Sequence, residues 1–103
     1  MVKSYDDVYK VVEAAVNAYM QKQDSTEIAF EINDNGSCTI VNKQNRKKFV
    51  LMFAQFADEF KVGFAFYEPD ELGNIDSPEW IEDTFNYDFN EKFVTTLITE
   101  HLI

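Results

Sequence analysis

The chain has 103 residues, of which 46% are hydrophobic and 16% aromatic, so it has enough apolar material for one folded domain over 1–103. A formal net charge of −10 repels phosphate backbones and anionic headgroups, and we expect no direct nucleic-acid binding and no membrane binding. Cys38 is the single cysteine, which excludes an intrachain disulfide and favours a reducing, cytoplasmic location.

The N-terminal segment has the pattern of an amphipathic helix over 5–22. Ser4 followed by Asp7 has the spacing of a capping box, in which side chains satisfy the free amides of a helix start. The polar stretch 21–26 is the expected exit loop. Apolar side chains recur at helical spacing at Tyr5, Val8, Val12, Ala15, Val16 and Tyr19.

Residues 27–42 have the alternating pattern of a β-hairpin. A three-residue loop at 34–36, with Gly36 in the left-handed conformation, places Ile32 opposite Cys38 and Phe30 opposite Ile40. This register unites the apolar side chains on one face. A two-residue turn would instead pair a glutamate with an isoleucine, so we favour the three-residue loop.

Residues 47–60 fit two assignments. As a fourth strand over 48–56, they would turn near 58–59 and pair Phe53 with Phe64 and Ala54 with Gly63. As a helix, they begin with lysines and end with acidic residues, which opposes the helix dipole at a cost of about 0.3–1 kcal/mol per charge. We favour the helix, because one helical face would collect Phe49, Met52, Phe53, Phe56 and Phe60.

The C-terminal third combines a strand over 61–67 with two helix signals. Ser77 and Pro78 are a typical N-cap and first helical residue, which predicts a short helix to about residue 85. Asp88 with Glu91 predicts the start of a last helix, whose buried face would hold Phe93, Val94, Leu97, Ile98 and Leu102.

These elements predict an α+β fold. Its small antiparallel sheet would consist of the hairpin 27–42 and strand 61–67, with 48–56 as the alternative fourth strand. The N-terminal helix and the C-terminal helices would pack on one face of this sheet.

Signals of catalysis and of cofactor or metal binding are weak in this sequence. We expect His101, the single histidine, to be exposed near a helix C-terminus, and Cys38 to be a core residue. Carboxylate pairs such as Asp70 and Asp76 lack a marked nucleophile or electrophile nearby. The sequence has no GxGxxG, GxxxxGK[ST] or HExxH motif. We therefore expect no enzyme activity, no cofactor and no metal.

The strongest feature of the sequence is its segregated charge. Nine acidic residues and no basic one lie from Glu68 to Glu91, whereas four basic residues cluster within 43–48. Trp80 lies inside this acidic stretch, and an aromatic ring among carboxylates suits the centre of an interface with a basic partner. The alternative is a solvated acidic face, in which Trp80 packs inward with Ile81 and Phe85. The predicted partner-binding residues are Glu68, Asp70, Glu71, Asp76, Glu79, Trp80, Glu82, Asp83 and Asp88.

These features predict a small acidic binding protein that inhibits or sequesters a basic protein partner. In size, acidity and element order, the chain resembles acidic inhibitors of nucleic-acid-binding clefts, of the anti-defence, immunity or DNA-mimic type, and also acidic secretion chaperones. The alternative function is a chaperone-like or homodimeric adaptor that binds another chain through its sheet face, around Phe64 and Phe66. The first function requires a continuous negative surface, which pairing with Arg46, Lys47 and Lys48 would remove.

Overall fold

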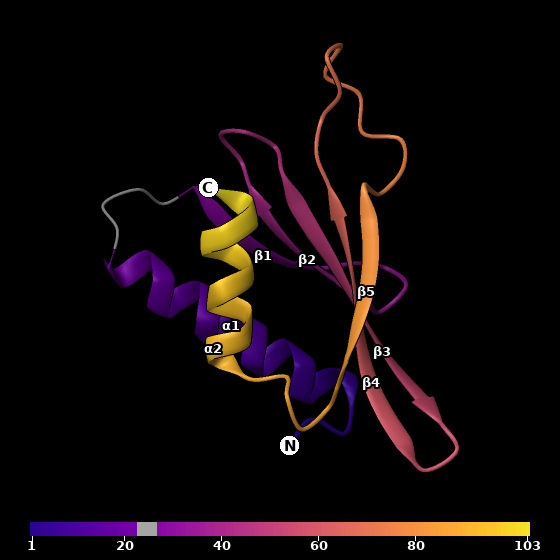
Figure 1. The fold of residues 1–103 in the computed structure, drawn as a ribbon. Helices are drawn as coiled ribbons and strands as arrows, with labels where there is room; N and C mark the ends of the chain where they lie inside the picture. The colour runs from indigo at the N-terminus through magenta and orange to yellow at the C-terminus, as the bar shows by residue number, and fades with distance from the viewer. Residues whose placement is uncertain (23–26) are drawn as a thin grey trace.

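A helix precedes a five-stranded sheet, and a second helix follows it, in the computed structural model, which describes residues 1–22 and 27–103 (Figure 1). The elements in chain order are α1 (Tyr5–Lys22), β1 (Ile28–Ile32), β2 (Cys38–Asn42), β3 (Lys48–Phe56), β4 (Glu59–Tyr67), β5 (Trp80–Phe85), α2 (Glu91–Leu97) and a short π-helical stretch, η1 (Ile98–Leu102). Helix α1 includes the first two residues of the expected exit loop 21–26, and the other four lie outside the described residues.

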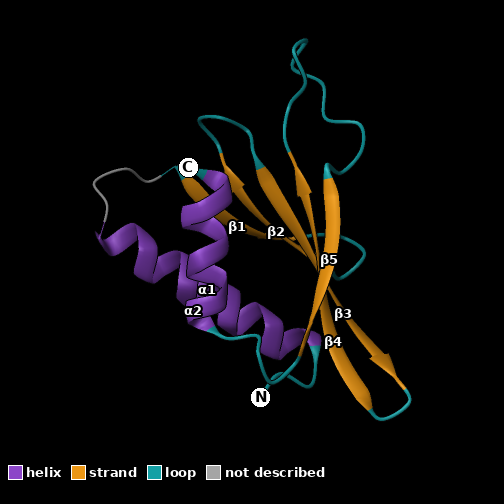
Figure 2. Cartoon of the chain, in the orientation of Figure 1, coloured by secondary structure: helices purple, strands orange, loops and turns teal. Residues whose placement is uncertain are grey.

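The sheet is an antiparallel meander with the strand order β1-β2-β3-β4-β5. Helices α1 and α2 cover the same face of the sheet, and the described chain places no second layer on the opposite face (Figure 2). We call this opposite side the open face. The predicted α+β class is confirmed, with five strands where three or four were expected.

The N-terminal end of α1 has the capping interactions that the sequence predicts. The backbone amide of Asp7 donates to Ser4 Oγ at 3.2 Å, and Asp7 Oδ2 accepts from the backbone amide of Lys3 at 2.9 Å, so the acidic side chain closes the capping box one residue early. The buried face of the helix includes Val8 and Val12. In the described part of the chain, no helix has the length and apolar character needed to cross a membrane.

The β1–β2 hairpin has the predicted register. Ile32 lies opposite Cys38 and Phe30 opposite Ile40, and the three-residue loop is closed by Gly36 at a φ of 92°. This φ lies in the left-handed region, which glycine adopts without a steric penalty. The hydroxyl of Tyr9 donates to the carbonyl oxygen of Gly36 and so ties α1 to the hairpin.

The preferred helix over 47–60 is wrong, because this segment forms β3 and the start of β4. The strand alternative is confirmed, but its register shifts by two residues, with Phe53 opposite Val62 and Leu51 opposite Phe64. The turn lies one residue earlier than expected, since Phe56 already pairs with Glu59. As a central strand, β3 hydrogen-bonds to a neighbour on each side, and this outweighs the helical spacing of its phenylalanines.

The expected helix after Ser77 is also wrong, because residues 80–85 form the edge strand β5. The free side of β4 offers backbone partners to this segment, which outweigh the local N-cap signal. The last helix exists, but its N-cap is Asn90 and not Asp88. Asn90 Oδ1 accepts from the backbone amide of Phe93 at 2.9 Å.

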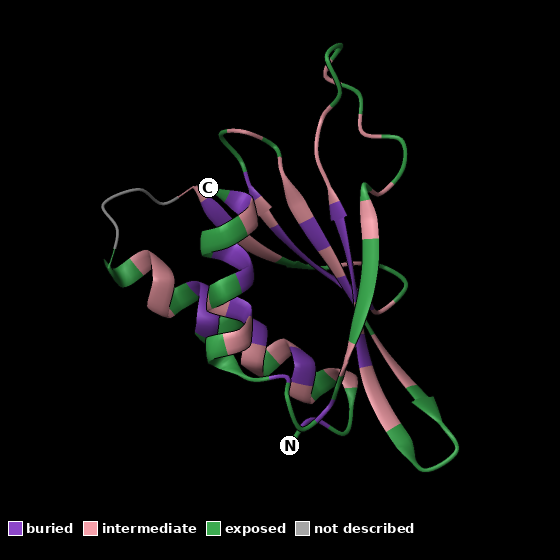
Figure 3. Cartoon of the chain, in the orientation of Figure 1, coloured by how far each residue is buried: buried purple, intermediate pink, exposed green. Residues whose placement is uncertain are grey.

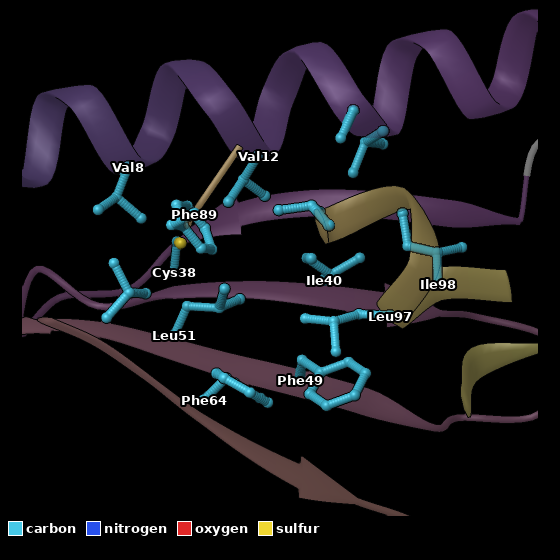
Figure 4. Packing of buried hydrophobic residues seen from close by; sticks show 14 of the residues in the cluster. Val8, Val12, Cys38, Ile40, Phe49, Leu51, Phe64, Phe89, Leu97 and Ile98 are labelled. Atoms are coloured by element: carbon cyan, nitrogen blue, oxygen red, sulfur yellow. The ribbon is translucent and has the colours of Figure 1, made fainter. Parts of the chain in front are cut away.

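The hydrophobic core lies between the sheet and the two helices (Figures 3 and 4). Phe49 and Leu51 of β3 are fully buried there, and Cys38 is buried with them as predicted. Phe64 and Phe66 also face this side and are 4% and 7% exposed. The adaptor alternative therefore cannot use these two side chains, because the helices cover the face on which they lie.

Candidate functional site

The predicted binding residues begin in the long loop between β4 and β5, residues 68–79, which we call the acidic loop. It projects beyond the end of the sheet (Figure 1). Asp70 builds its tip, because Asp70 Oδ1 accepts from the backbone amides of Leu72 and Asn74, each at 2.9 Å. Gly73 completes the turn at a φ of 81°. The loop has a defined shape and carries Glu68, Asp70, Glu71, Asp76 and Glu79.

The basic cluster at 43–48 contacts this loop both at its tip and at its base. Arg46 Nη1 donates to the carbonyl oxygen of Gly73 at 2.8 Å, and Lys47 Nζ lies 3.9 Å from Glu68 Oε2. The ammonium group of Lys48 lies 5.2 Å from the ring centroid of Tyr67. The charge segregation of the sequence is therefore not kept in space, and Glu68 has a basic neighbour.

Strand β5 directs its carboxylates to different sides of the sheet. Asp83 lies on the open face, where its Oδ1 is 4.0 Å from Lys61 Nζ. Glu82 points to the helix side, opposite Phe64, and Asp88 follows beyond the far end of the strand. The predicted residues thus do not form one compact patch. Most of them lie along the acidic loop and β5, which together we call the acidic edge, and Asp88 lies beyond it.

Trp80 packs inward, but against other residues than the sequence suggested. Its ring stacks on Phe66 at 5.5 Å between centroids and meets Phe49 edge-on at 5.6 Å. His101 of η1 lies edge-on to it at 5.1 Å. The expected neighbours of Trp80 in a helix, Ile81 and Phe85, do not share its side of the sheet, because alternate residues of a strand point to opposite faces.

A groove of about 610 Å³ separates β5 from α2 on the helix side. Its aromatic floor includes Trp80, Phe64 and Phe93, with His101 at its wall. Sequence reasoning missed this groove and the place of His101, because both depend on β5 and α2 lying side by side. Charged side chains at its rim are Glu82, Asp88, Lys92 and Glu100.

The protonation of Cys38 and the arrangement of possible metal ligands limit the chemistry of the described residues. Burial raises the pKa of the Cys38 thiol from 9.0 to about 12, so at neutral pH this side chain is a protonated core residue and not a nucleophile. Within residues 1–22 and 27–103, no group of three or more His, Cys, Asp or Glu side chains is arranged to hold a metal ion.

Comparison with known proteins gives no family to which the chain can be assigned. No family model, curated protein or solved structure matches it. The function is therefore argued from the geometry of the acidic edge and the groove.

Proposed function

We propose that this protein is a small acidic binding protein that sequesters or inhibits a basic protein partner through its acidic edge. The observation that carries the proposal is the position of β5. It is the last strand of the sheet, its carboxylates and most of those of the preceding loop are exposed, and an aromatic groove lies beside it. Exposed carboxylates steer a basic partner, and the partly buried Trp80 provides a contact centre.

The internal ion pairs of the acidic edge leave it available to a partner. The side chains of Glu68 and Asp83 are 43% and 61% exposed, and their lysine partners lie at 3.9 and 4.0 Å. Exposed pairs of this kind contribute about 0–1 kcal/mol, so the cations of a partner can replace the lysines. Glu71, Asp76 and Glu79 are exposed at the loop and add to the negative field.

A charge-reversal experiment tests the proposal. A pull-down from the native host followed by mass spectrometry first identifies the partner, and calorimetry then measures its affinity. The variant Glu71→Lys/Asp76→Lys/Glu79→Lys should weaken binding by at least about tenfold, and wild-type affinity should fall steeply with added salt. The matched control, with the same change in net charge away from the acidic edge, is Glu13→Lys/Glu31→Lys/Asp34→Lys. Equal affinities of the two triple variants would reject the acidic edge as the binding surface.

The open face supports a second candidate, a dimeric adaptor. It exposes Met52 by 44% and Ile81 by 64%, and Phe85, 37% exposed, stacks on Tyr87 at 5.2 Å. These side chains replace Phe64 and Phe66 as the apolar contact of the adaptor alternative. Dimerisation at low micromolar concentration with weak salt dependence, abolished by Ile81→Lys, would support it. A chain that sediments as a monomer throughout that range would reject it.

A further inference from the structure

We propose that the outer edge of β5 binds an extended basic segment of the partner as a sixth strand of the sheet, with alternate side chains of that segment in the groove between β5 and α2. The inference rests on the proposed function, because it assumes a basic protein partner, and it adds the conformation and register in which that partner is held. Three observations support it. Within residues 1–22 and 27–103, no strand pairs with the outer side of β5. The other two are the aromatic floor of the groove and the charge of its rim.

The first observation is the hydrogen-bonding pattern of β5. The backbone amide of Asn86 donates to the carbonyl oxygen of Phe60 at 2.9 Å, and this pair continues the register of β4 and β5. Because hydrogen-bonded pairs alternate along antiparallel strands, the even-numbered residues of β5 direct their backbone groups toward β4. The odd-numbered residues direct theirs outward, to the edge of the sheet, and these are Ile81, Asp83 and Phe85.

An outward-facing backbone of this kind is the template for strand addition. An incoming segment gains main-chain hydrogen bonds along β5, and its side chains point alternately to the groove and to the open face. Strand β5 has six residues, so it can order a segment of similar length. Main-chain pairing supplies affinity, and the two rows of side chains supply specificity.

The groove determines which side chains fit on the helix side. Its floor is formed by the rings of Trp80, Phe64 and Phe93, over which the aliphatic stem and ammonium group of a lysine can lie. Its rim carries three carboxylates and one ammonium group, on Glu82, Asp88, Glu100 and Lys92. The net charge of the rim is therefore negative and complementary to lysine.

The open face determines which side chains fit at the alternate positions of the bound segment. A residue paired with Ile81 or Phe85 lies beside an exposed apolar side chain, which favours an aliphatic, β-branched partner. The fitting segment therefore alternates lysine and valine, with lysine on the groove side and valine on the open side. An acetylated and amidated seven-residue peptide of alternating Lys and Val serves as the probe.

The experiment separates strand addition from general charge attraction. The chain has one tryptophan, so the fluorescence of Trp80 reports binding at the groove. In the proposed register, the valine residues of the probe direct their amides toward β5. N-methylation of the valine amides should weaken binding by more than about tenfold, because two or three hydrogen bonds are lost. N-methylation of the lysine amides, which point away from β5, is the matched control and should leave affinity within about twofold of the parent peptide.

Variants of the protein test the rim. The double variant Glu82→Gln/Glu100→Gln should bind the parent peptide about threefold to tenfold more weakly, as expected for two exposed ion pairs. Glu13→Gln/Glu59→Gln removes the same charge away from the groove and should bind like the wild type. Equal effects of the two double variants would overturn the assigned rim.

The remaining outcomes keep the two proposals distinguishable. Equal affinities of the two methylated peptides would overturn strand addition and leave recognition of basic partners intact. Absence of any binding by the parent peptide would also overturn strand addition. The proposed function fails separately, if reversing the charges of the acidic loop leaves the affinity of the isolated partner unchanged.

Discussion

His101 and Trp80 lie edge-on to each other, with ring centroids 5.1 Å apart, although the histidine comes from η1 and the tryptophan from the edge strand β5. The imidazole also lies 5.7 Å from the rings of Phe49 and Phe66. This contact joins the C-terminal end of the chain to the outermost strand. It makes His101 part of the wall that holds β5 in place, whereas the sequence predicted a solvent-exposed residue.

Replacement of the His101 imidazole should weaken the packing around Trp80 in the groove. His101→Ala should lower the free energy of unfolding by about 1 kcal/mol, because aromatic pairs contribute 0.5–1.5 kcal/mol beyond their buried area. It should also shift the emission of Trp80 to longer wavelength as water reaches the indole. Urea unfolding followed by fluorescence measures both effects. His101→Phe keeps a ring at this position and should recover most of the stability, and an equal loss in both variants would contradict the ring contact.

Asn42 should be the most sensitive polar residue of the sheet. Its Nδ2 donates to the carbonyl oxygen of Leu102 at 2.7 Å, and its Oδ1 accepts from the backbone amide of Gln44 at 2.9 Å. Asn42→Ala should lower the free energy of unfolding by about 1–3 kcal/mol, because it removes two hydrogen bonds made by a buried side chain. Asn45 donates to the same carbonyl at 2.9 Å but is less buried, so Asn45→Ala should cost less. The reverse order in urea titrations would contradict this ranking.

The burial of Cys38 predicts a pH dependence of stability. The unfolded thiol ionises near 9.0, whereas the folded thiol keeps its proton until about pH 12. Its contribution is therefore complete below pH 9.0 and is lost as the pH rises toward 12, by about 1.4 kcal/mol per pH unit. The stability difference between wild type and Cys38→Val, measured by urea unfolding on both sides of pH 9.0, isolates this thiol. A difference that does not change with pH would refute the prediction.

Asp70 should act on the shape of the acidic loop more than on its charge. Asp70→Ala removes the acceptor of two backbone amides and should cost about 1 kcal/mol of stability. Asp70→Asn keeps the Oδ1 acceptor and removes only the charge, so it should cost less. Hydrogen exchange at the amides of Leu72 and Asn74 localises the effect. Equally fast exchange in Asp70→Asn and Asp70→Ala would show that the charge, and not the Oδ1 acceptor, determines the turn.

The parts of the fold that were predicted correctly have local causes. The helix 5–22 follows from apolar spacing, and the β1–β2 register follows from the turn at Gly36 and the need to bury one face. The sequence of the β3–β4 turn contains no glycine to mark it, because the residue in the left-handed region is Ala57, at a φ of 54°. The N-cap signal at Ser77 predicted a helix that does not form, because backbone pairing with β4 outweighed this local helix preference.

The binding surface was only partly predictable. The sequence identified the acidic stretch around Trp80, but not that alternate residues of β5 send Glu82 and Asp83 to opposite sides. Contact between Arg46 and Gly73 joins residues 27 positions apart, and no local pattern indicates it. The groove requires an edge strand and a distant helix to lie together, so it belongs to the tertiary structure alone.

The carboxylates of β5 also disfavour pairing of this edge strand with β5 of a second copy of the chain. An unpaired strand invites an identical strand from a second copy, which is the usual beginning of ordered aggregation. If two copies of this chain approached through β5, Glu82 and Asp83 of one would meet the same side chains of the other, and like charges across strands are destabilising. The same residues that favour a cationic partner thus disfavour self-association of the protein through β5.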